Sequence, residues 1–194
     1  MSRLWGRRKT KQLILALLTL AVLTLAAIKP EWFDSGSQIA RQNQPGFYSV
    51  IRFDDGDTIA VDMNGQNETV RFIGVDTPET HDPRKAVQCF GYAATVYTKN
   101  LVGKSRVRLE ADSLNTNRDR YGRLLRYIYL PDGTLVNAKI IQDGYGFAYT
   151  LFPFEKADEF RSYERQAREA SQGLWSACEI TDNGAAKQTN PITD

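Results

Sequence analysis

An α+β fold with five strands and three helices is predicted for this chain of 194 residues by two observations. Short apolar segments that alternate or are rich in β-branched residues, separated by turn sequences, predict the strands. Segments with apolar residues at helical spacing, each followed by a glycine, predict the helices. These elements interleave between residues 47 and 178. The chain is too short for two ordinary domains plus a targeting segment, so we expect one domain.

The five strands are separated by clear turn signals. Asp54-Asp55-Gly56-Asp57 and Asn64-Gly65-Gln66-Asn67 divide the first three, which we therefore expect to form an antiparallel meander. A Pro131-Asp132-Gly133 turn closes the last one. The expected strands cover residues 48–53, 58–63, 69–75, 107–111 and 123–130.

The three helices end near Gly103, Gly144 and Gly173, and glycine readily terminates a helix. The expected helices cover residues 88–101, 136–142 and 155–172. Five short strands interleaved with helices are typical of a partly open barrel of the OB type, so the full prediction is a five-stranded OB-fold barrel with three helices. Folds of this type commonly bind oligonucleotides on one face.

The chain begins with an export sequence. Its first twelve residues carry five positive side chains and no negative one, and an apolar run without charge follows from Leu13 to Ile28. This run is shorter than the roughly 20 residues of a full membrane span, so residues 1–28 are either a cleaved signal peptide or an uncleaved signal-anchor. We expect a polar linker over residues 29–46, a globular domain over 47–178 outside the cytoplasm, and a disordered tail over 179–194.

The exported part of the chain has more acidic than basic groups. The first twelve residues contain five of the 25 Lys and Arg residues but none of the 23 Asp and Glu residues. Coating nucleic acid by bulk positive charge requires many contacts from Lys and Arg to phosphates. That class of protein is therefore excluded, and any recognition of phosphate must be local.

The two cysteines, Cys89 and Cys178, both follow the export sequence and therefore reach a compartment in which disulfides form. A bridge between them would close a loop of about 90 residues and stabilise the domain by about 4 kcal/mol in the chain-entropy model. Two unrelated buried thiols are the alternative interpretation.

Three polar clusters carry the candidate chemistry: Asp55-Gly56-Asp57-Thr58, then Arg71 with Asp76-Thr77-Pro78-Glu79, and Arg118-Asp119-Arg120-Tyr121-Gly122-Arg123. Each has an ordinary explanation by itself, because an Asp-Gly pair is usually a hairpin turn and a charged loop is usually solvated. In this order and spacing, and together with Cys89-Phe90-Gly91 and Gly173-Leu174-Trp175-Ser176, they resemble the staphylococcal nuclease (thermonuclease) family. The resemblance covers about residues 50–175.

The resemblance implies one calcium ion, held by the carboxylates of Asp57 and Asp76 and by the backbone carbonyl of Thr77. Oxygen ligands of this kind suit a hard divalent cation. It also implies that Glu79 acts as general base, and an orienter of the attacking water is the competing interpretation. Arg71 and Arg123 match the two active-site arginines of the family, and a guanidinium donates two parallel hydrogen bonds to phosphate.

Four further residues match substrate contacts of the family. Tyr121 matches a tyrosine that contacts the phosphate, and Tyr149 matches one that stacks near the base, which suits an enzyme without strong base preference. Arg120 replaces a lysine, and Lys85 occupies a matching basic loop position. The chain departs from the family at Leu151, where the type member has a second tyrosine.

The sequence therefore predicts an exported, calcium-dependent, sugar-nonspecific nuclease of the micrococcal nuclease type. It would be a monomer that acts on DNA and RNA, secreted or attached to the membrane through residues 1–28. The resemblance implies cleavage of the P–O5′ bond to leave 3′-phosphate ends. Two alternatives remain, a noncatalytic OB module that binds single strands and a membrane-anchored adaptor that uses the barrel for protein contacts.

Overall fold

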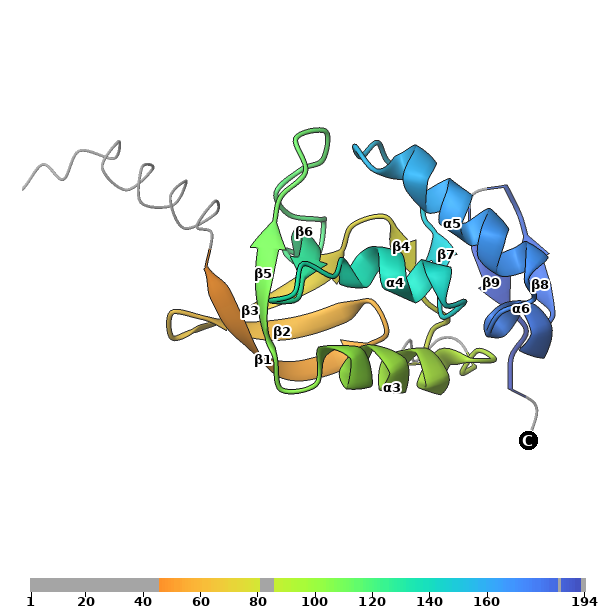
Figure 1. Ribbon diagram of the computed structural model, residues 1–194, viewed down its shortest axis with the longest axis horizontal. Coiled ribbons are helices and arrows are strands. Elements are labelled where there is room, and N and C mark those ends of the chain that lie inside the picture. The colour runs from red at the N-terminus through yellow and green to blue at the C-terminus, as the bar shows by residue number, and fades with distance from the viewer. Residues whose placement is uncertain (1–45, 81–85, 185, 193–194) are drawn as a thin grey trace, which may run out of the picture. The chain divides into compact units, whose positions relative to one another are not determined.

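The computed structural model describes residues 46–80, 86–184 and 186–192 (Figure 1). The predicted export sequence and nearly all of the predicted linker, as well as Lys85, lie outside these residues. No helix among the described residues is both long enough and apolar enough to cross a membrane.

Five strands close into a barrel in the order β1-β2-β3-β6-β5. The strands β3 and β6 are parallel, and every other pair in the barrel is antiparallel, including the predicted meander of the first three strands. The five-stranded barrel is thus confirmed, although it is closed rather than partly open. The barrel strands are β1 (Phe47–Asp55), β2 (Thr58–Met63), β3 (Gln66–Phe72), β5 (Arg106–Glu110) and β6 (Leu124–Tyr129).

The helices cover the barrel and meet its apolar core. Side chains such as Ile59 of β2, Ile128 of β6 and Phe160 of α5 are fully buried there, and such burial stabilises each by roughly 1.5–3 kcal/mol. The second predicted helix is confirmed at its bounds, and the first and third are shorter than predicted; α6 is an additional single turn. The helices are α3 (Gly91–Val102), α4 (Val136–Gln142), α5 (Ala157–Glu169) and α6 (Leu174–Ala177).

The predicted strand over residues 69–75 is divided in the structure. Gly74 has a positive φ of 72°, and a Cβ there would lie 2.6 Å from the ring of Phe154. Only glycine tolerates both conditions, so the chain turns out of the barrel at this residue. The next two residues form β4 (Val75–Asp76), which pairs with β7 (Phe147–Ala148) in a separate two-stranded sheet. Asp76 therefore belongs to this small sheet and not to the barrel.

The C-terminal hairpin, β8 (Ile180–Asp182) and β9 (Lys187–Thr189), corrects the prediction of a disordered tail. The structure joins Cys89 to Cys178 in a disulfide immediately before the hairpin. Backbone hydrogen bonds then attach the hairpin's end to the segment before α3, from Cys89 N to Asn190 O at 2.7 Å and from Ile192 N to Val87 O at 2.8 Å. The composition of the tail does not indicate these long-range contacts. The tail has few apolar residues to bury, so the disulfide and the hydrogen bonds hold the hairpin in place.

Candidate active site

Asp57 connects the β1–β2 turn to the segment that follows β4. Its Oδ2 atom accepts hydrogen bonds from the backbone N–H of Thr77 at 2.8 Å and from the Thr77 hydroxyl at 3.1 Å. The turn itself is held from the other side, because the hydroxyl of Thr98 in α3 donates to the carbonyl oxygen of Gly56 at 2.7 Å. Two of the three clusters found in the sequence thus meet, and Asp57 is only 4% exposed.

Arg71 lies between two carboxylates. The residue belongs to β3 and pairs with Thr58 of the neighbouring strand β2, which brings it beside Asp57. Its guanidinium forms ion pairs with Asp57 through Nη1 and with Asp76 through Nη2, the latter at 2.7 Å. The side chain of Arg71 is 15% exposed, so these charges interact in a poorly solvated setting.

Burial, with a smaller contribution from neighbouring carboxylates, raises the pKa of two aspartates of this cluster. Burial and the neighbouring Asp57 raise the pKa of Asp55 to about 8. Burial raises the pKa of Asp76 to about 6, although Arg71 opposes the shift, and Asp57 and Glu79 add to it. Burial alone would raise the pKa of Asp57 too, but Arg71 and several hydrogen bonds hold it below its ordinary value. Asp55 was not selected as a site residue from the sequence, although it lies in the same turn as Asp57.

Glu79 is held at the end of the segment that begins with Asp76. Its backbone N–H donates to Oε1 of Gln88 at 2.8 Å, and its carbonyl accepts from the N–H of Gln88 at 2.9 Å. Its own Oε1 atom accepts from the N–H of Thr80 at 2.8 Å. Because Glu79 contributes to the raised pKa of Asp76, the two carboxylates lie within electrostatic range of each other.

Arg123 is positioned by Asp119 rather than by the carboxylate cluster. The Oδ2 atom of Asp119 accepts from Nε of Arg123 at 2.7 Å, and Oδ1 accepts from its backbone N–H at 3.0 Å. The β3–β6 register pairs Arg71 with Leu125, two residues beyond Arg123. Arg123 itself immediately precedes β6, which begins at Leu124. Among the described residues, no hydrogen bond or ion pair joins Arg123 to Asp57, Arg71 or Asp76.

Two tyrosines lie near these charges. Tyr121 is 66% exposed, and its hydroxyl accepts a hydrogen bond from Nη2 of Arg120 at 2.6 Å. Burial and Asp76 raise the pKa of Tyr149, while Arg71 and Arg120 lower it. Tyr149 follows β7, and its backbone N–H donates to the carbonyl of Gly74, two residues before Asp76, at 2.9 Å. It therefore lies within electrostatic range of both the carboxylate cluster and the loop that carries Arg120 and Arg123.

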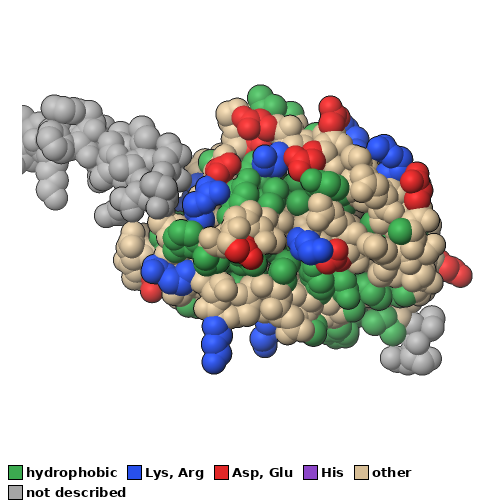
Figure 2. Space-filling model, viewed as in Figure 1, with side chains coloured by type: hydrophobic (Ala, Val, Ile, Leu, Met, Phe, Trp, Pro, Cys, Tyr) green, Lys and Arg blue, Asp and Glu red, His purple; other side chains and the backbone are tan. Residues whose placement is uncertain are grey.

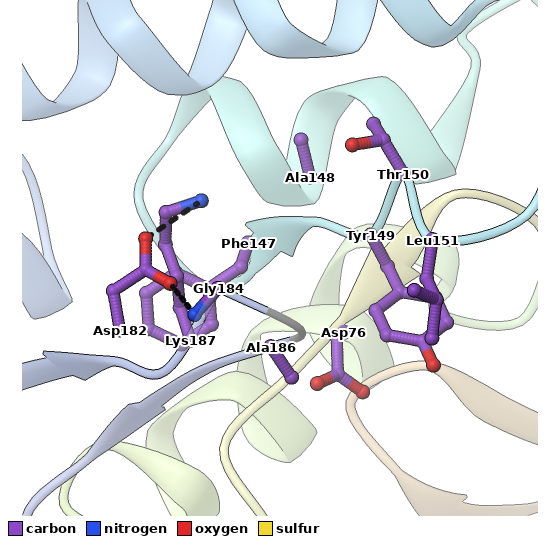
Figure 3. Close-up of a pocket in the computed structure, with 10 residues that line it drawn as sticks. All are labelled: Asp76, Phe147, Ala148, Tyr149, Thr150, Leu151, Asp182, Gly184, Ala186 and Lys187. Carbon is purple, nitrogen blue, oxygen red and sulfur yellow. Dashed lines mark hydrogen bonds and ion pairs between the residues drawn. The ribbon is translucent and has the colours of Figure 1, made fainter.

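A pocket of about 260 Å³ opens beside this cluster. Figure 3 shows Asp76 drawn between Tyr149 and Leu151 on one side and the C-terminal hairpin on the other. The contribution of the C-terminal hairpin to this pocket was not predicted from the sequence, because no motif in the hairpin indicates contact with the barrel. On the face shown in Figure 2, basic and acidic side chains are scattered rather than gathered in one basic patch.

The donor atoms of the cluster fit a hard cation. The described residues contain no group of three or more His, Cys, Asp or Glu side chains placed to hold a metal ion by themselves. However, Asp57 and Asp76 direct carboxylate oxygens at one shared cation, the guanidinium of Arg71, and Thr77 is hydrogen-bonded to Asp57. Two carboxylates and a nearby backbone carbonyl are oxygen donors that suit calcium and leave room for water and phosphate.

The fold and the site define a class of protein, an OB-fold domain in which two carboxylates share one arginine beside the barrel. A family model described as staphylococcal nuclease homologue matches residues 69–177. Thermonuclease of Staphylococcus hyicus is 34% identical over 171 residues, which cover 88% of this chain and 99% of that protein. Thermonuclease of Staphylococcus intermedius is 43% identical over 125 residues, covering 64% of this chain and 71% of that protein. Endonuclease YncB of Bacillus subtilis is 42% identical over 124 residues, which cover 63% of this chain and 58% of that protein.

The chain belongs to the staphylococcal nuclease family and is a nuclease of that family. The family resemblance inferred from the sequence is therefore confirmed. The matched region begins within β3 and ends with α6, so the C-terminal hairpin lies beyond it.

Proposed function

We propose that this protein is a calcium-dependent, sugar-nonspecific endonuclease that hydrolyses DNA and RNA at the P–O5′ bond and leaves 3′-phosphate ends. The observation that carries the proposal is the convergence of Asp57 and Asp76 on Arg71 beside the barrel. Oxygen donors for a cation and a donor fork for phosphate are thereby combined in one small, poorly solvated site.

Asp57, Asp76 and the carbonyl of Thr77 would hold the calcium ion. Calcium, when bound there, supplies positive charge to the phosphate and to the attacking water. Two hydrogen bonds from Thr77 fix the carboxylate of Asp57, so this proposed calcium ligand is already oriented before the ion binds. Such preorganisation reduces the reorganisation that the reaction would otherwise require.

Glu79 handles the water that attacks phosphorus, either by accepting its proton or by orienting it. Its backbone is fixed by Gln88, and its carboxylate is oriented by the N–H of Thr80. General-base assistance from a positioned carboxylate typically contributes a factor of roughly 10²–10⁴. The reaction is an in-line displacement in which the 5′-oxygen leaves.

Arg71 and Arg123 bind the phosphate oxygens, on which negative charge grows in the transition state. When calcium binds the carboxylate oxygens of Asp57 and Asp76, Arg71 would give up some of its ion-pair contacts with them and donate hydrogen bonds to the phosphate instead. Asp119 holds the backbone and Nε of Arg123. The outer nitrogens of its guanidinium would then bind the phosphate.

Tyr121 and Arg120 would contact the phosphate side of the nucleotide, and Tyr149 its base. Lys85 is a further proposed basic contact from a position outside the described residues. Tyr121 is well placed for this because it is exposed and flanked by two guanidinium groups, 4.8 Å and 5.4 Å from its ring centroid. Aromatic stacking accepts every base, which is consistent with action on both DNA and RNA.

The proposal includes export of the domain as a monomer, secreted or retained at the membrane through residues 1–28. The disulfide between Cys89 and Cys178 is compatible with an oxidising compartment.

The test is digestion of plasmid DNA and of RNA by the purified domain in calcium and in chelator, with analysis of the product ends. Cleavage of both substrates in calcium alone, with 3′-phosphate ends, is expected. Full activity in chelator would refute the calcium requirement. Tight binding of single strands without cleavage would instead favour the noncatalytic OB module.

A further inference from the structure

We propose that Gln88 is a positioning residue for Glu79, and that the C-terminal segment, residues 189–192, holds Gln88 in place from the opposite side. This inference rests on the proposed nuclease function, in which Glu79 handles the attacking water. It extends that function to a segment beyond the region that the family model matches, which ends at residue 177. The C-terminal segment contributes to the reaction by fixing the backbone of Glu79 through Gln88.

Glu79 needs such support because its own segment has no regular structure. Residues 77–80 follow β4 and belong to no helix or strand, so their backbone groups need partners from elsewhere in the chain. Gln88 binds both backbone polar groups of Glu79. Its Oε1 atom accepts the N–H of Glu79 at 2.8 Å, and its own N–H donates to the carbonyl of Glu79 at 2.9 Å. These two hydrogen bonds fix the point from which the Glu79 side chain extends.

The chemistry of Gln88 suits this role. Gln88 is buried, and a buried polar group costs free energy unless it is hydrogen-bonded. Its amide oxygen meets that requirement at the N–H of Glu79. An amide also accepts this hydrogen bond without carrying a charge, whereas a carboxylate in its place would add to the negative charge of Asp76 and Glu79. A neutral acceptor therefore fixes the backbone and adds no charge to the carboxylate cluster.

The C-terminal segment pairs with the stretch of chain that contains Gln88. Gln88 and Pro191 form an antiparallel bridge. Two backbone hydrogen bonds flank this bridge, from Cys89 N to Asn190 O at 2.7 Å and from Ile192 N to Val87 O at 2.8 Å. In an antiparallel ladder, alternate residues bond to the partner strand, so the N–H of Gln88 points to the other side, where it meets Glu79.

Further contacts fix this arrangement to the rest of the domain. The hydroxyl of Thr189 donates to the carbonyl of Cys89 at 2.7 Å, and the disulfide to Cys178 attaches the same residue covalently. The first residue of α3 packs against Glu79, because a Cβ at Gly91 would lie 3.1 Å from the Glu79 carbonyl oxygen. Such support matters because a catalytic group displaced by about 1 Å can lose roughly 100-fold in rate.

The first test is Gln88→Met, which keeps the length of the side chain but lacks the amide oxygen. Cleavage of a labelled oligonucleotide at several substrate concentrations separates kcat from KM, and calorimetry gives the calcium affinity. We expect kcat to fall by about 10- to 100-fold, as for a base displaced by up to about 1 Å. KM and calcium affinity should stay unchanged, because Asp57 is fixed by Thr77 and not by Gln88. A parallel loss of calcium affinity would show a general structural role and overturn the proposal.

Gln166→Met is the matched control. Gln166 is exposed on α5, where its amide donates to the hydroxyl of Ser162 at 3.2 Å. This variant loses the same amide group at a site that takes no part in the proposed reaction. It should cleave as the unaltered protein does, and an equal fall in kcat would overturn the proposal.

A double variant shows whether Gln88 acts through Glu79. Once Glu79→Gln has removed the carboxylate, no base is left to position, so the addition of Gln88→Met should lower kcat no further. Equal relative losses in the two backgrounds would overturn the positioning role, as would an unchanged kcat in Gln88→Met alone. Either result would leave the nuclease proposal intact. Failure of the unaltered protein to cleave in calcium would instead refute the nuclease function itself.

Ile192→Pro tests the support from the C-terminal segment, because proline lacks the N–H that donates to the carbonyl of Val87. Ile192→Ala is its control, since it loses the same partly exposed side chain and keeps the N–H. The kcat of the proline variant should lie about two- to tenfold below that of the alanine variant, the factor that corresponds to one hydrogen bond. Equal kcat values in the two variants would overturn the role given to the C-terminal segment.

Discussion

Asp57 and Thr77, twenty residues apart, are joined by two hydrogen bonds to one carboxylate oxygen, at 2.8 Å and 3.1 Å. This contact joins the β1–β2 turn to the end of β4. It therefore fixes the positions of two proposed calcium ligands relative to each other. Gly56 makes the approach possible, since a Cβ there would lie 2.8 Å from Cγ2 of Thr77 and 2.9 Å from Cβ of Ala94.

Gly56→Ala should therefore separate Thr77 from Asp57 and weaken calcium binding by about tenfold, the size of one lost hydrogen bond to a charged group. Titration of calcium by calorimetry measures this. Gly65→Ala is the control, because a Cβ at Gly65 meets no atom within 4 Å although φ is 85°. It should cost about 1 kcal/mol of stability and leave calcium affinity unchanged. Equal calcium affinity in both variants would contradict the role given to Gly56.

Glu79→Gln keeps the size of the side chain and its acceptor for the N–H of Thr80, but removes the base. We expect kcat to fall by roughly 10²–10⁴ with little change in calcium affinity. Single-turnover cleavage of a labelled oligonucleotide gives the rate, and circular dichroism verifies the fold. A variant with the activity of the unaltered protein would remove Glu79 from the mechanism.

Arg71→Lys keeps the positive charge between Asp57 and Asp76 but loses the planar fork. Loss of one transition-state donor typically costs about 3 kcal/mol, so kcat/KM should fall by roughly 100-fold. The comparison is Arg161→Lys, where the arginine pairs with exposed Asp158 on α5. That variant should cleave normally, because surface ion pairs contribute little. Normal cleavage by Arg71→Lys would show that charge alone suffices.

In chelator, the free energy of unfolding should fall as pH rises from about 5 to about 8. The pKa of Asp55 is raised to about 8 and that of Asp76 to about 6 in the folded protein, against 3.8 for an ordinary aspartate. The stabilisation from binding these protons is complete below that ordinary value and is lost as pH passes through 6 and then 8. The depressed pKa of Asp57 acts oppositely, and its contribution is lost only at lower pH.

Urea unfolding across this pH range measures the effect. Asp55→Asn should flatten the upper part of the curve, and calcium should restore stability most at high pH, where the carboxylates are ionised. A free energy of unfolding that rises between about pH 5 and about pH 8 in chelator would show that burial and the neighbouring carboxylates do not raise the pKa of Asp55 and Asp76.

The Cys89→Ser/Cys178→Ser double variant should lose about 4 kcal/mol of stability, because the bridge closes a long loop, with a sequence separation of 89 residues. Urea unfolding of the variant and of the unaltered protein at the same pH gives the difference. Susceptibility to proteolysis should rise within residues 180–192, since the hairpin loses its covalent attachment. Equal stability and equal proteolysis would mean that the hydrogen bonds to residues 87–89 suffice.

Much of the fold and the site follows from local patterns. The barrel strands and the helix at 136–142 were predicted, because periodicity and turn residues act over short stretches of chain. The clusters around Asp57, Arg71 and Arg123 were instead grouped by their resemblance to a family. The division of the strand at Gly74 was not predicted. A glycine inside an apolar run looks the same whether the strand continues or turns, and contact with Phe154 decides between them.

By itself, the sequence determined the kind of barrel, the residue types available for chemistry and the family to which they belong. Only the tertiary structure decided that Arg71 is shared by Asp57 and Asp76, that Asp55 adds a further carboxyl group, and that the C-terminal hairpin lies beside Asp76. The physical reason is the separation along the chain over which each kind of interaction acts. Strand and helix patterns report on neighbours in the chain, whereas pKa values, ion pairs and pocket walls depend on residues brought together by closure of the barrel and by the Cys89–Cys178 bridge.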